Sequence, residues 1–275
     1  MDYSVIIRTK NSEKTIKACL EGLLSQTIKP LEIIVVDSGS RDNTLPIVKE
    51  FGVVIIDYPK GQKFNYSKAL NIGIAKTISP FILILSSHVE FLDFQSIYFM
   101  HNVFVEDEQC ITVSMVRTDK KNKINGSSML NKNKITLRDF KGQAMYNFCS
   151  LIRKESWNEH NFDEKIMRCE DQEWAYYFLK KNFHAIIIKE PQIYYDNSYY
   201  NFQKDLWDII VIGETVYPYY NSKYYLFELL KKSFKYLKKG NNRLFIREFR
   251  MFLGLFSYKY LRKKTIESVY NNKLE

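Results

Sequence analysis

The chain has 275 residues, of which 45% are hydrophobic and 26% are charged, and this composition excludes a disordered or fibrous protein. Its net charge of +10 is unevenly placed, because residues 222–275 carry 14 Lys and Arg against 4 Asp and Glu while residues 1–221 are balanced. A balanced body with a basic C-terminal segment is not the pattern of a general nucleic-acid binder, and we expect no nucleic-acid partner.

Cysteine usage and hydropathy narrow the class further. The four cysteines are far apart and form no C-x-x-C pair, which argues against a zinc site or a disulfide framework and favours a reducing compartment. No signal-peptide pattern precedes the first strand-like run, and no stretch approaches the roughly 18 to 20 apolar residues of a membrane span. We therefore expect a cytoplasmic protein.

Strand-like and helix-like segments alternate through the first ninety residues. Short β-branched runs predict strands, and apolar residues at helical spacing predict the helices between them, the first one capped by Asn11 or Ser12. This order predicts an α/β fold with a mostly parallel sheet flanked by helices, and a site beyond the carboxyl ends of the strands. The predicted strands cover residues 3–8, 31–36, 53–57 and 81–85, and the predicted helices cover 12–26, 44–51 and 68–77.

The pattern weakens between residues 106 and 147. Segment 117–143 is polar and rich in Lys and Asn, which predicts an irregular connection over the site. We divide the chain into a first domain of residues 1–205 and a helical, basic extension of residues 206–275. Within the first domain, order is expected to resume with a strand at 148–153, a structured segment at 162–166, a helix at 170–181 and a strand at 185–188.

Several motifs in this order resemble one family. In sequence and spacing, over residues 3 to about 195, the chain resembles the inverting family-two glycosyltransferases with the GT-A nucleotide-sugar fold. The resemblance implies transfer of a sugar from a UDP- or dTDP-sugar to a hydroxyl of a bacterial-type surface glycan such as a capsule or lipopolysaccharide. The motifs are Ser4–Thr44 (SVIIRTKNSEKTIKACLEGLLSQTIKPLEIIVVDSGSRDNT), Ala69–Gly73 (ALNIG), the strand that ends at His88, and Phe162–Glu164 followed by Glu170 and Asp171.

The donor side of the implied site begins at Asp37. An ionised carboxylate at the end of a buried strand is costly unless it faces the crevice or is hydrogen-bonded. The resemblance implies that Asp37 accepts the imide N–H of a uracil or thymine ring; the alternative is that Asp37 caps its own turn, which includes Ser38. Thr9 and Asn11 would line the other side of the base or ribose, with capping of the first helix as their alternative role.

Ser86, Ser87 and His88 depart from the family pattern. Most members carry an Asp-x-Asp element here, whose last carboxylate holds a divalent metal on the diphosphate, and His88 stands in its place. Imidazole binds Mn²⁺, although Mn²⁺ and Mg²⁺ prefer oxygen ligands, and it can also hydrogen-bond a diphosphate directly. We expect all three residues at the diphosphate and leave metal binding by His88 open. Many members also carry a histidine after the next strand, where this chain has Asp196 as a substitute.

The departing β-phosphate needs a positive group to offset its charge. Lys60, Lys63 and Lys68 follow predicted strands and are candidates, and the helix beginning at Lys68 offers its N-terminus as well. Each lysine could instead be solvated. Ser38 and Asn71 complete the predicted contacts to the nucleotide sugar.

Glu170 and Asp171 open a predicted helix. Inverting transfer needs a base that removes the proton from the acceptor hydroxyl while its oxygen attacks the anomeric carbon. The resemblance implies that Asp171 is this base, that Glu170 places the acceptor or a phosphate, and that Trp174 contacts the acceptor. The alternative is that both carboxylates only favour the helix dipole. Asp163 and Glu164 are expected to stabilise the preceding turn.

Segment 224–264 contains two helix-like stretches with aromatic and aliphatic residues on one face and lysines and arginines on the other. Basic amphipathic helices suit the surface of an anionic bilayer. This predicts peripheral association with the inner face of the cell membrane and a glycan or lipid-linked saccharide as acceptor. The helices could instead pack on the first domain through their apolar stripe.

Two other functions remain open from the sequence. One is a catalytically weakened module that binds a sugar nucleotide or glycan, which the missing Asp-x-Asp motivates and the retained Glu-Asp opposes. The other is a membrane-associated scaffold that uses the basic segment. A sugar nucleotidylyltransferase is disfavoured because the Gly-rich phosphate loop is absent.

Overall fold

The computed structural model describes residues 2–118, 131–140, 143–166, 168–195 and 223–238, together with 240, 242, 245–246, 248–250, 252–253 and 256. The chain divides into two compact units, Met1–Tyr199 and Tyr200–Glu275. The boundary predicted between residues 205 and 206 lies outside the described residues, as do Asp196 and segment 257–264.

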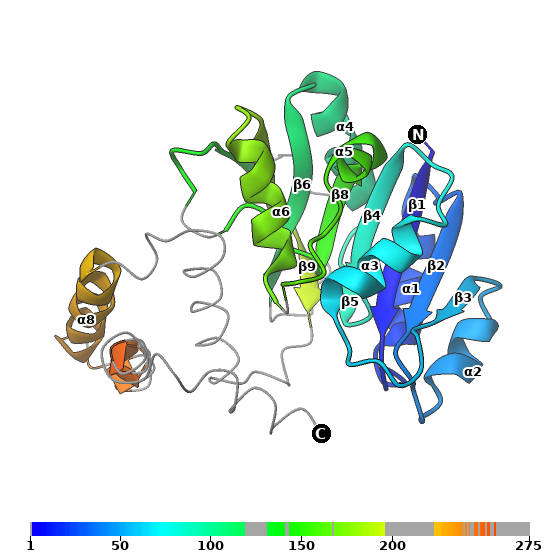
Figure 1. Ribbon diagram of the computed structural model, residues 1–275, viewed down its shortest axis with the longest axis horizontal. Coiled ribbons are helices and arrows are strands. Elements are labelled where there is room, and N and C mark those ends of the chain that lie inside the picture. Colours follow the sequence, from blue (N-terminus) through cyan, green and yellow to red (C-terminus); the bar gives the residue numbers. More distant parts are fainter. Residues whose placement is uncertain are drawn as a thin grey trace. The chain divides into compact units, whose positions relative to one another are not determined.

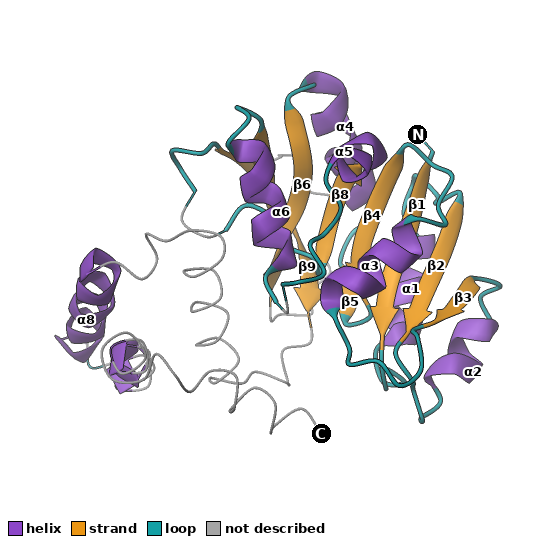
Figure 2. Cartoon of the chain, in the orientation of Figure 1, coloured by secondary structure: helices purple, strands orange, loops and turns teal. Residues whose placement is uncertain are grey.

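A central mixed sheet flanked by helices forms the N-terminal unit and confirms the predicted α/β class (Figures 1 and 2). Its strand order is β3-β2-β1-β4-β8-β6-β9-β5, and β7 also pairs with β9. The described strands are β1 (Tyr3–Thr9), β2 (Glu32–Asp37), β3 (Val54–Asp57), β4 (Phe81–Ser86), β5 (Val89–Phe91), β6 (Cys110–Thr118), β7 (Asn131–Ile135), β8 (Cys149–Arg153) and β9 (His184–Tyr195). The described helices are α1 (Ile16–Leu24), α2 (Thr44–Lys49), α3 (Tyr66–Ile74), α4 (Ser96–Glu106), α5 (Lys154–Glu159), α6 (Glu170–Leu179) and, in the C-terminal unit, α8 (Lys223–Lys238).

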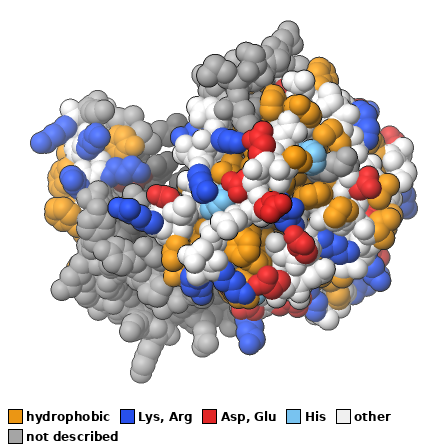
Figure 3. Space-filling model, turned by 90° about the horizontal axis from the view of Figure 1, so that it is seen from above, with side chains coloured by type: hydrophobic (Ala, Val, Ile, Leu, Met, Phe, Trp, Pro, Cys, Tyr) orange, Lys and Arg blue, Asp and Glu red, His pale blue; other side chains and the backbone are white. Residues whose placement is uncertain are grey.

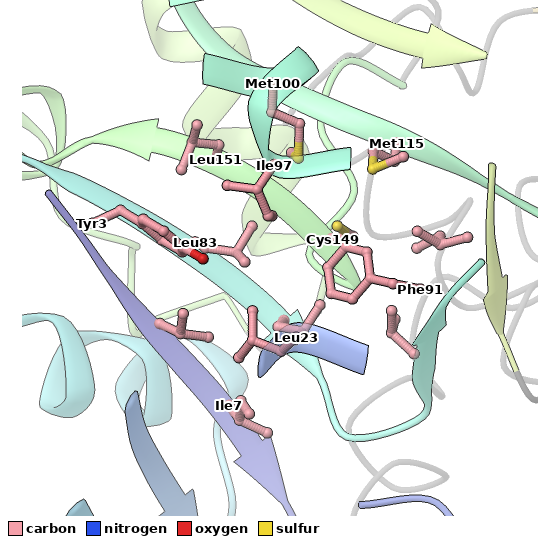
Figure 4. Packing of buried hydrophobic residues seen from close by; sticks show 14 of the residues in the cluster. Tyr3, Ile7, Leu23, Leu83, Phe91, Ile97, Met100, Met115, Cys149 and Leu151 are labelled. Atoms are coloured by element: carbon pink, nitrogen blue, oxygen red, sulfur yellow. The ribbon is translucent and has the colours of Figure 1, made fainter. Parts of the chain in front are cut away.

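Apolar side chains from both faces of the sheet hold the helices in place. On one face Leu23 of α1 and Ile97 of α4 pack with Tyr3 and Leu83 of the strands, as Figure 4 shows. The other face carries α3, α5 and α6 (Figure 1). Gly73 of α3 lies against this face so closely that an added Cβ would be 2.8 Å from Cγ2 of Ile6.

One edge of the sheet gathers the carboxyl ends of six strands, including β3, which is parallel to β2. β1 pairs in parallel with β2 and β4, whereas β8 is antiparallel to both β4 and β6, so β6 runs in the same direction as β1. β9 is parallel to β6, and the arrowheads of β1, β2 and β9 point to the same edge in Figure 1. The segment that enters β8 also lies at this edge, which is where open α/β sheets bind ligands.

The first helix differs from its predicted start. α1 begins at Ile16, and its N-cap is Thr15. The carbonyl of Ser12 accepts the N–H groups of both Thr15 and Ile16, so the preceding residues form a turn. Capping of this helix by Asn11 or Ser12 is therefore wrong, and Asn11 has a left-handed φ of 50°.

The irregular connection predicted for segment 117–143 is wrong in part. β6 occupies residues up to Thr118, and β7 forms at Asn131–Ile135, where its backbone pairs with β9. Every β7 residue except Ile135 is exposed, so pairing and not an apolar pattern makes this strand. β9 is also longer than predicted and continues to Tyr195.

The C-terminal unit contains the helix α8. Lysine and apolar side chains lie together on it, and Figure 3 shows them in blue and orange on the segment at the left. Leu226 and Leu229 are buried, whereas Phe227, Phe234 and Leu237 are exposed. None of the helices described here has the length and apolar character needed to cross a membrane.

Candidate active site

Glu170 begins α6 and is buried at the carboxyl edge of the sheet, with 4% of its surface exposed. Its Oε1 accepts hydrogen bonds from Nη1 of Arg8 and from Nδ2 of Asn147, both at 2.9 Å. The guanidinium of Arg8 also lies over the ring of Tyr66, 5.0 Å from its centroid. The charge of Glu170 is thus compensated, which a buried carboxylate requires.

Asp171 lies beside Glu170 and has no cationic partner of its own in a salt bridge among the described residues. Its Oδ2 accepts the backbone N–H of Asn147 at 3.2 Å, and its Oδ1 accepts the backbone N–H of Gln172 at 2.9 Å. Burial and the neighbouring charge of Glu170 raise the pKa of Asp171 to about 7, against the opposing effect of these hydrogen bonds and Arg8. A carboxylate with a pKa near neutrality suits general base catalysis.

The sequence analysis gave no role to Arg8 or Asn147, although Arg8 lies at a strand end where the site was expected. Arg8 had a signal, because a charged residue near the end of a buried strand faces either a partner or a site. Asn147 had none, since it precedes β8 in the weakly patterned region. The structure makes Asn147 the link between the two carboxylates, and its own Oδ1 is buried without a hydrogen-bond partner within the described part of the chain.

Asp37 ends β2 with 2% of its surface exposed, and its carboxylate holds the turn that follows. Oδ2 accepts the N–H groups of Gly39 and Ser40, each at 2.9 Å, and Oδ1 accepts the hydroxyl of Ser40. The turn-capping alternative is therefore present in the structure. Contact with a base stays a prediction that would use the remaining lone pairs of the carboxylate.

Thr9, Asn11 and Ser38 lie around Asp37. Thr9 pairs with Asp37 across β1 and β2, and its buried Oγ1 has no hydrogen-bond partner among the described residues. Ser38 donates its hydroxyl to the carbonyl of Thr9 at 3.2 Å. Asn11 accepts the N–H of Arg41 at 2.8 Å through Oδ1, so it joins the loops after β1 and β2.

Ser86 ends β4 at the same edge, and Ser87 and His88 follow it. Ser86 pairs with Arg8 across β1 and β4, and its hydroxyl accepts the N–H of His88 at 3.4 Å. Ser87 is buried and shares a 2.9 Å hydrogen bond with the hydroxyl of Ser12. Nδ1 of His88 lies 3.2 Å from the hydroxyl of Thr15.

A divalent metal does not fit the described donor set. No three His, Cys, Asp or Glu side chains in the described ranges lie close enough together to hold a metal ion. Mn²⁺ and Mg²⁺ both prefer several oxygen ligands, and no carboxylate cluster in the described ranges supplies them next to His88. We therefore derive no step through a metal.

Four residues predicted to contact the nucleotide sugar lie on α3 or in the loop before it. Lys60 and Lys63 are exposed, and Nζ of Lys68 donates to the side chain of Gln62. Asn71 uses its whole amide within the chain. Its Oδ1 accepts from Nε1 of Trp157 and from N of Phe162, and its Nδ2 donates to the carbonyl of Phe162 and to Glu164.

Trp174, for which an acceptor contact was predicted, lies in the hydrophobic core. The ring is fully buried, with 0% of its surface exposed, and packs against Phe162 and Phe178. Its Nε1–H donates to the carbonyl of His160 at 2.7 Å. A ring without exposed surface has none to offer a sugar, so Trp174 is a core residue.

The turn before α6 is stabilised as expected. Asp163 accepts the N–H of Lys165 at 2.9 Å through Oδ1, and Glu164 accepts from Asn71. The left-handed backbone of Cys169, with φ 61° and ψ 30°, then starts α6. This conformation is uncommon for a residue other than glycine and turns the chain so that Glu170 and Asp171 face the strand ends.

Comparison with known sequences agrees with this arrangement. Residues 4–160 match the model of the family described as Glycosyl transferase family 2. The O-antigen chain rhamnosyltransferase RfbN of Salmonella typhimurium is 32% identical over 84 residues, which cover 30% of this chain and 27% of that protein. The UDP-Glc:alpha-D-GlcNAc-diphosphoundecaprenol beta-1,3-glucosyltransferase WfaP of Escherichia coli is 31% identical over 122 residues, covering 40% and 49%. The chain thus matches about half or less of the length of these curated relatives.

Comparison with solved structures shows the same fold. The mannosyltransferase PcManGT from Pyrobaculum calidifontis, in complex with GDP-Man and Mn2+, superposes with a TM-score of 0.68 at 13% identity, covering 95% of this chain and 88% of that one. S. aureus TarS 1-349 superposes with a TM-score of 0.57 at 15% identity, covering 100% and 76%. The expected GT-A architecture is confirmed by these likenesses.

Proposed function

The chain belongs to glycosyl transferase family 2, and from this membership we propose that it is an inverting glycosyltransferase that uses a UDP- or dTDP-sugar. The observation that carries the proposal is the placement of Asp171. This carboxylate lies at the carboxyl edge of the sheet, fixed by Asn147 and Gln172, with its pKa raised to about 7 by burial and by Glu170.

The proposed reaction is a single displacement. The acceptor oxygen forms a bond to the anomeric carbon from the face opposite the leaving group, and the bond from that carbon to the β-phosphate oxygen breaks. The electron pair leaves with the nucleoside diphosphate, and the proton of the acceptor hydroxyl passes to Asp171. Glu170, which pairs with Arg8, contributes to the raised pKa of Asp171, and a raised pKa strengthens Asp171 as a base.

The nucleotide would lie beyond β1, β2 and β4. The unpartnered hydroxyl of Thr9 supports a contact there, because a buried hydroxyl without a partner is costly unless a ligand satisfies it. The neighbouring carboxylate of Asp37 and the hydroxyl of Ser38 complete the proposed base-binding group. Solved structures of TarS in complex with UDP and with UDP-GlcNAc support a uridine donor.

We propose a bacterial surface glycan, built on a lipid-linked saccharide, as the acceptor. The names of RfbN, an O-antigen enzyme, and of WfaP, which acts on a diphosphoundecaprenol-linked sugar, support this class. Exposed Phe227, Phe234 and Leu237 among the lysines of α8 support association with the cytoplasmic face of an anionic membrane, where such an acceptor lies.

Nucleotide binding and transfer test the enzymatic proposal. We expect UDP or dTDP to raise the melting temperature of the full chain, with GDP as the control, in buffers with and without Mn²⁺. Hydrolysis of a panel of UDP- and dTDP-sugars then identifies the donor. Asp171→Asn should abolish transfer while UDP binding stays within about twofold. A protein that responds to no uridine or thymidine nucleotide contradicts the proposal, and nucleotide binding without any transfer favours a binding module.

Vesicle sedimentation tests the membrane proposal. The full chain should bind vesicles of phosphatidylglycerol and phosphatidylcholine and not vesicles of phosphatidylcholine alone. Replacing Lys231, Lys235 and Lys238 of α8 by Gln should weaken this binding, since each basic residue near an anionic surface contributes about 1 kcal/mol. Equal binding by both proteins would overturn the role of α8.

A further inference from the structure

A cluster of three aromatic rings and one arginine occupies the carboxyl edge of the sheet next to the carboxylates. Arg117 is the penultimate residue of β6, and Tyr195 ends β9, its parallel neighbour. Tyr146 and Phe148 lead into β8, which pairs with β6 on its other side. We call Tyr146, Phe148 and Tyr195 the aromatic platform. None of these residues was identified from the sequence.

The ring of Phe148 contacts the other two rings of the platform. Tyr146 and Phe148 are stacked, with centroids 5.2 Å apart and an interplanar angle of 11°. Phe148 and Tyr195 follow at 5.5 Å with a tilt of 53°. All three rings are half-buried, so each retains surface for a ligand.

Arg117 lies over this platform. Its Cζ is 5.6 Å from the centroid of Phe148 and 5.2 Å from that of Tyr195. Two ring faces therefore hold one guanidinium through cation–π contacts. They restrict the side chain before any ligand binds, which lowers the entropy lost on binding.

The charge of Arg117 is not compensated by a carboxylate in the described residues. This separates it from Arg8, whose guanidinium is paired with Glu170. A guanidinium donates through a planar fork that matches phosphate oxygens, which makes arginine well suited to bidentate phosphate binding. Arg117, which is exposed, thus combines an uncompensated charge, contact with two ring faces and the appropriate donor geometry.

The platform adjoins both parts of the candidate site. Asn147, between Tyr146 and Phe148 in the chain, hydrogen-bonds Glu170 and Asp171. At the other end of the platform, the ring centroids of Tyr195 and His88 are 6.1 Å apart. Burial and the charge of Asp171 raise the pKa of Tyr146 while Arg117 opposes them, so this phenol lies within reach of both charges.

We propose that Arg117 and the aromatic platform bind a sugar linked to a phosphate or diphosphate, with the guanidinium on the phosphate and the rings against the apolar face of the sugar. This inference rests on the proposed function and assigns the positive group that the departing phosphate needs. The same chemistry occurs in two ligands of that reaction, the nucleotide-sugar donor and a lipid diphosphate-linked acceptor.

Calorimetric titration of the full chain with four probes tests the site: UDP, uridine, pyrophosphate, and N-acetylglucosamine 1-phosphate added to protein saturated with UDP. In Arg117→Gln we expect binding of at least one phosphate probe to weaken by about 10- to 100-fold, as loss of a charge-assisted hydrogen bond implies. Uridine binding should not change. Arg138→Gln, which removes an exposed charge from the same unit, is the control.

The probes distinguish the two sources. Weaker UDP and pyrophosphate binding places the donor diphosphate on Arg117. Unchanged UDP binding with weaker binding of the sugar phosphate places the acceptor there. Tyr195→Leu should weaken the same probe while Tyr195→Phe, which keeps the ring, should not. Wild-type protein that binds UDP, with all phosphate probes equal in Arg117→Gln, overturns this inference and leaves the proposed function standing. Wild-type protein that binds none of the probes overturns both.

Discussion

Arg8, near the end of the first strand, forms a 2.9 Å salt bridge with Glu170, which lies 162 residues further along the chain and opens α6. Both side chains are mostly buried, with 14% and 6% of their surface exposed. The pair therefore ties the first strand of the fold to the helix that carries the proposed base. Both charges also act on Asp171, whose pKa Glu170 raises and Arg8 lowers.

Replacement of Arg8 by Met should leave Glu170 buried without its cationic partner. Removing one member of a buried ion pair costs about 3–5 kcal/mol, so the free energy of unfolding in urea should fall by this order. Adding Glu170→Gln to Arg8→Met should restore part of the loss, because a neutral amide needs no counter-charge. Equal stability of Arg8→Met and wild type would show that the bridge contributes nothing.

The pKa of Asp171 predicts a specific pH dependence of stability. Because the folded-state pKa, about 7, is above the unfolded value of 3.8, folding of the wild type is favoured fully below about pH 4 and progressively less as the pH rises through 7. Asp171→Asn lacks this titration. The stability of the variant relative to wild type should therefore increase between pH 4 and pH 8, by at most about 4 kcal/mol.

Urea unfolding of both proteins at each pH measures this difference directly. At pH 4 the variant should be no more stable than wild type, since an amide cannot accept both N–H groups that Asp171 accepts. A difference that stays constant from pH 4 to pH 8 would contradict the raised pKa.

Substitution of Asn71 tests whether this residue has a structural or a nucleotide-binding role. Its replacement by Ala leaves the indole N–H of Trp157 and the backbone N–H of Phe162 without their acceptor. Each buried unsatisfied donor costs about 1–3 kcal/mol, so the unfolding free energy should fall by about 2–4 kcal/mol. Asn161→Ala, which removes one exposed amide bonded to the carbonyl of Trp157, should cost under about 1 kcal/mol. Weaker UDP binding without loss of stability would support the donor contact predicted from the sequence.

Cys169 provides a test of backbone strain at the site. Its φ of 61° is left-handed, which costs a non-glycine residue about 1–2 kcal/mol. Cys169→Gly should keep stability within about 1 kcal/mol of wild type, because the relieved strain offsets the greater entropy of an unfolded glycine. Cys169→Val should lose at least about 2 kcal/mol, since a β-branched side chain tolerates this conformation poorly. A valine variant as stable as the glycine variant in thermal unfolding would contradict the strain.

The periodic half of the fold was predictable from the sequence. The first four predicted strands match β1 to β4 within one residue at either end, because buried parallel strands are nearly continuous apolar runs. β7 was not predictable, because Asn131–Ile135 is polar and forms a strand only through its pairing with β9. The long reach of β9 to Tyr195 likewise depends on β5, β6 and β7 and not on its own residues.

The candidate site shows the same division. Motif order placed Asp171 and Glu170 at the carboxyl edge, together with Thr9 and Asp37. The acceptor role of Trp174 came from the family resemblance, which does not show which face of α6 is buried, and this residue faces the core. Asn147 and Arg117 depend on contacts between strands far apart in the chain, which a single sequence does not reveal.

The salt bridge between Arg8 and Glu170 joins two residues that are synthesised at different times. A ribosome adds about 5–20 residues per second, so Glu170 is joined to the nascent chain roughly 8 to 30 s after Arg8. During that interval the strands on the N-terminal side can pair while the proposed base has not yet been made. A nascent chain that ends before α6 therefore holds Arg8 without its counter-charge and lacks the carboxylate proposed as the base.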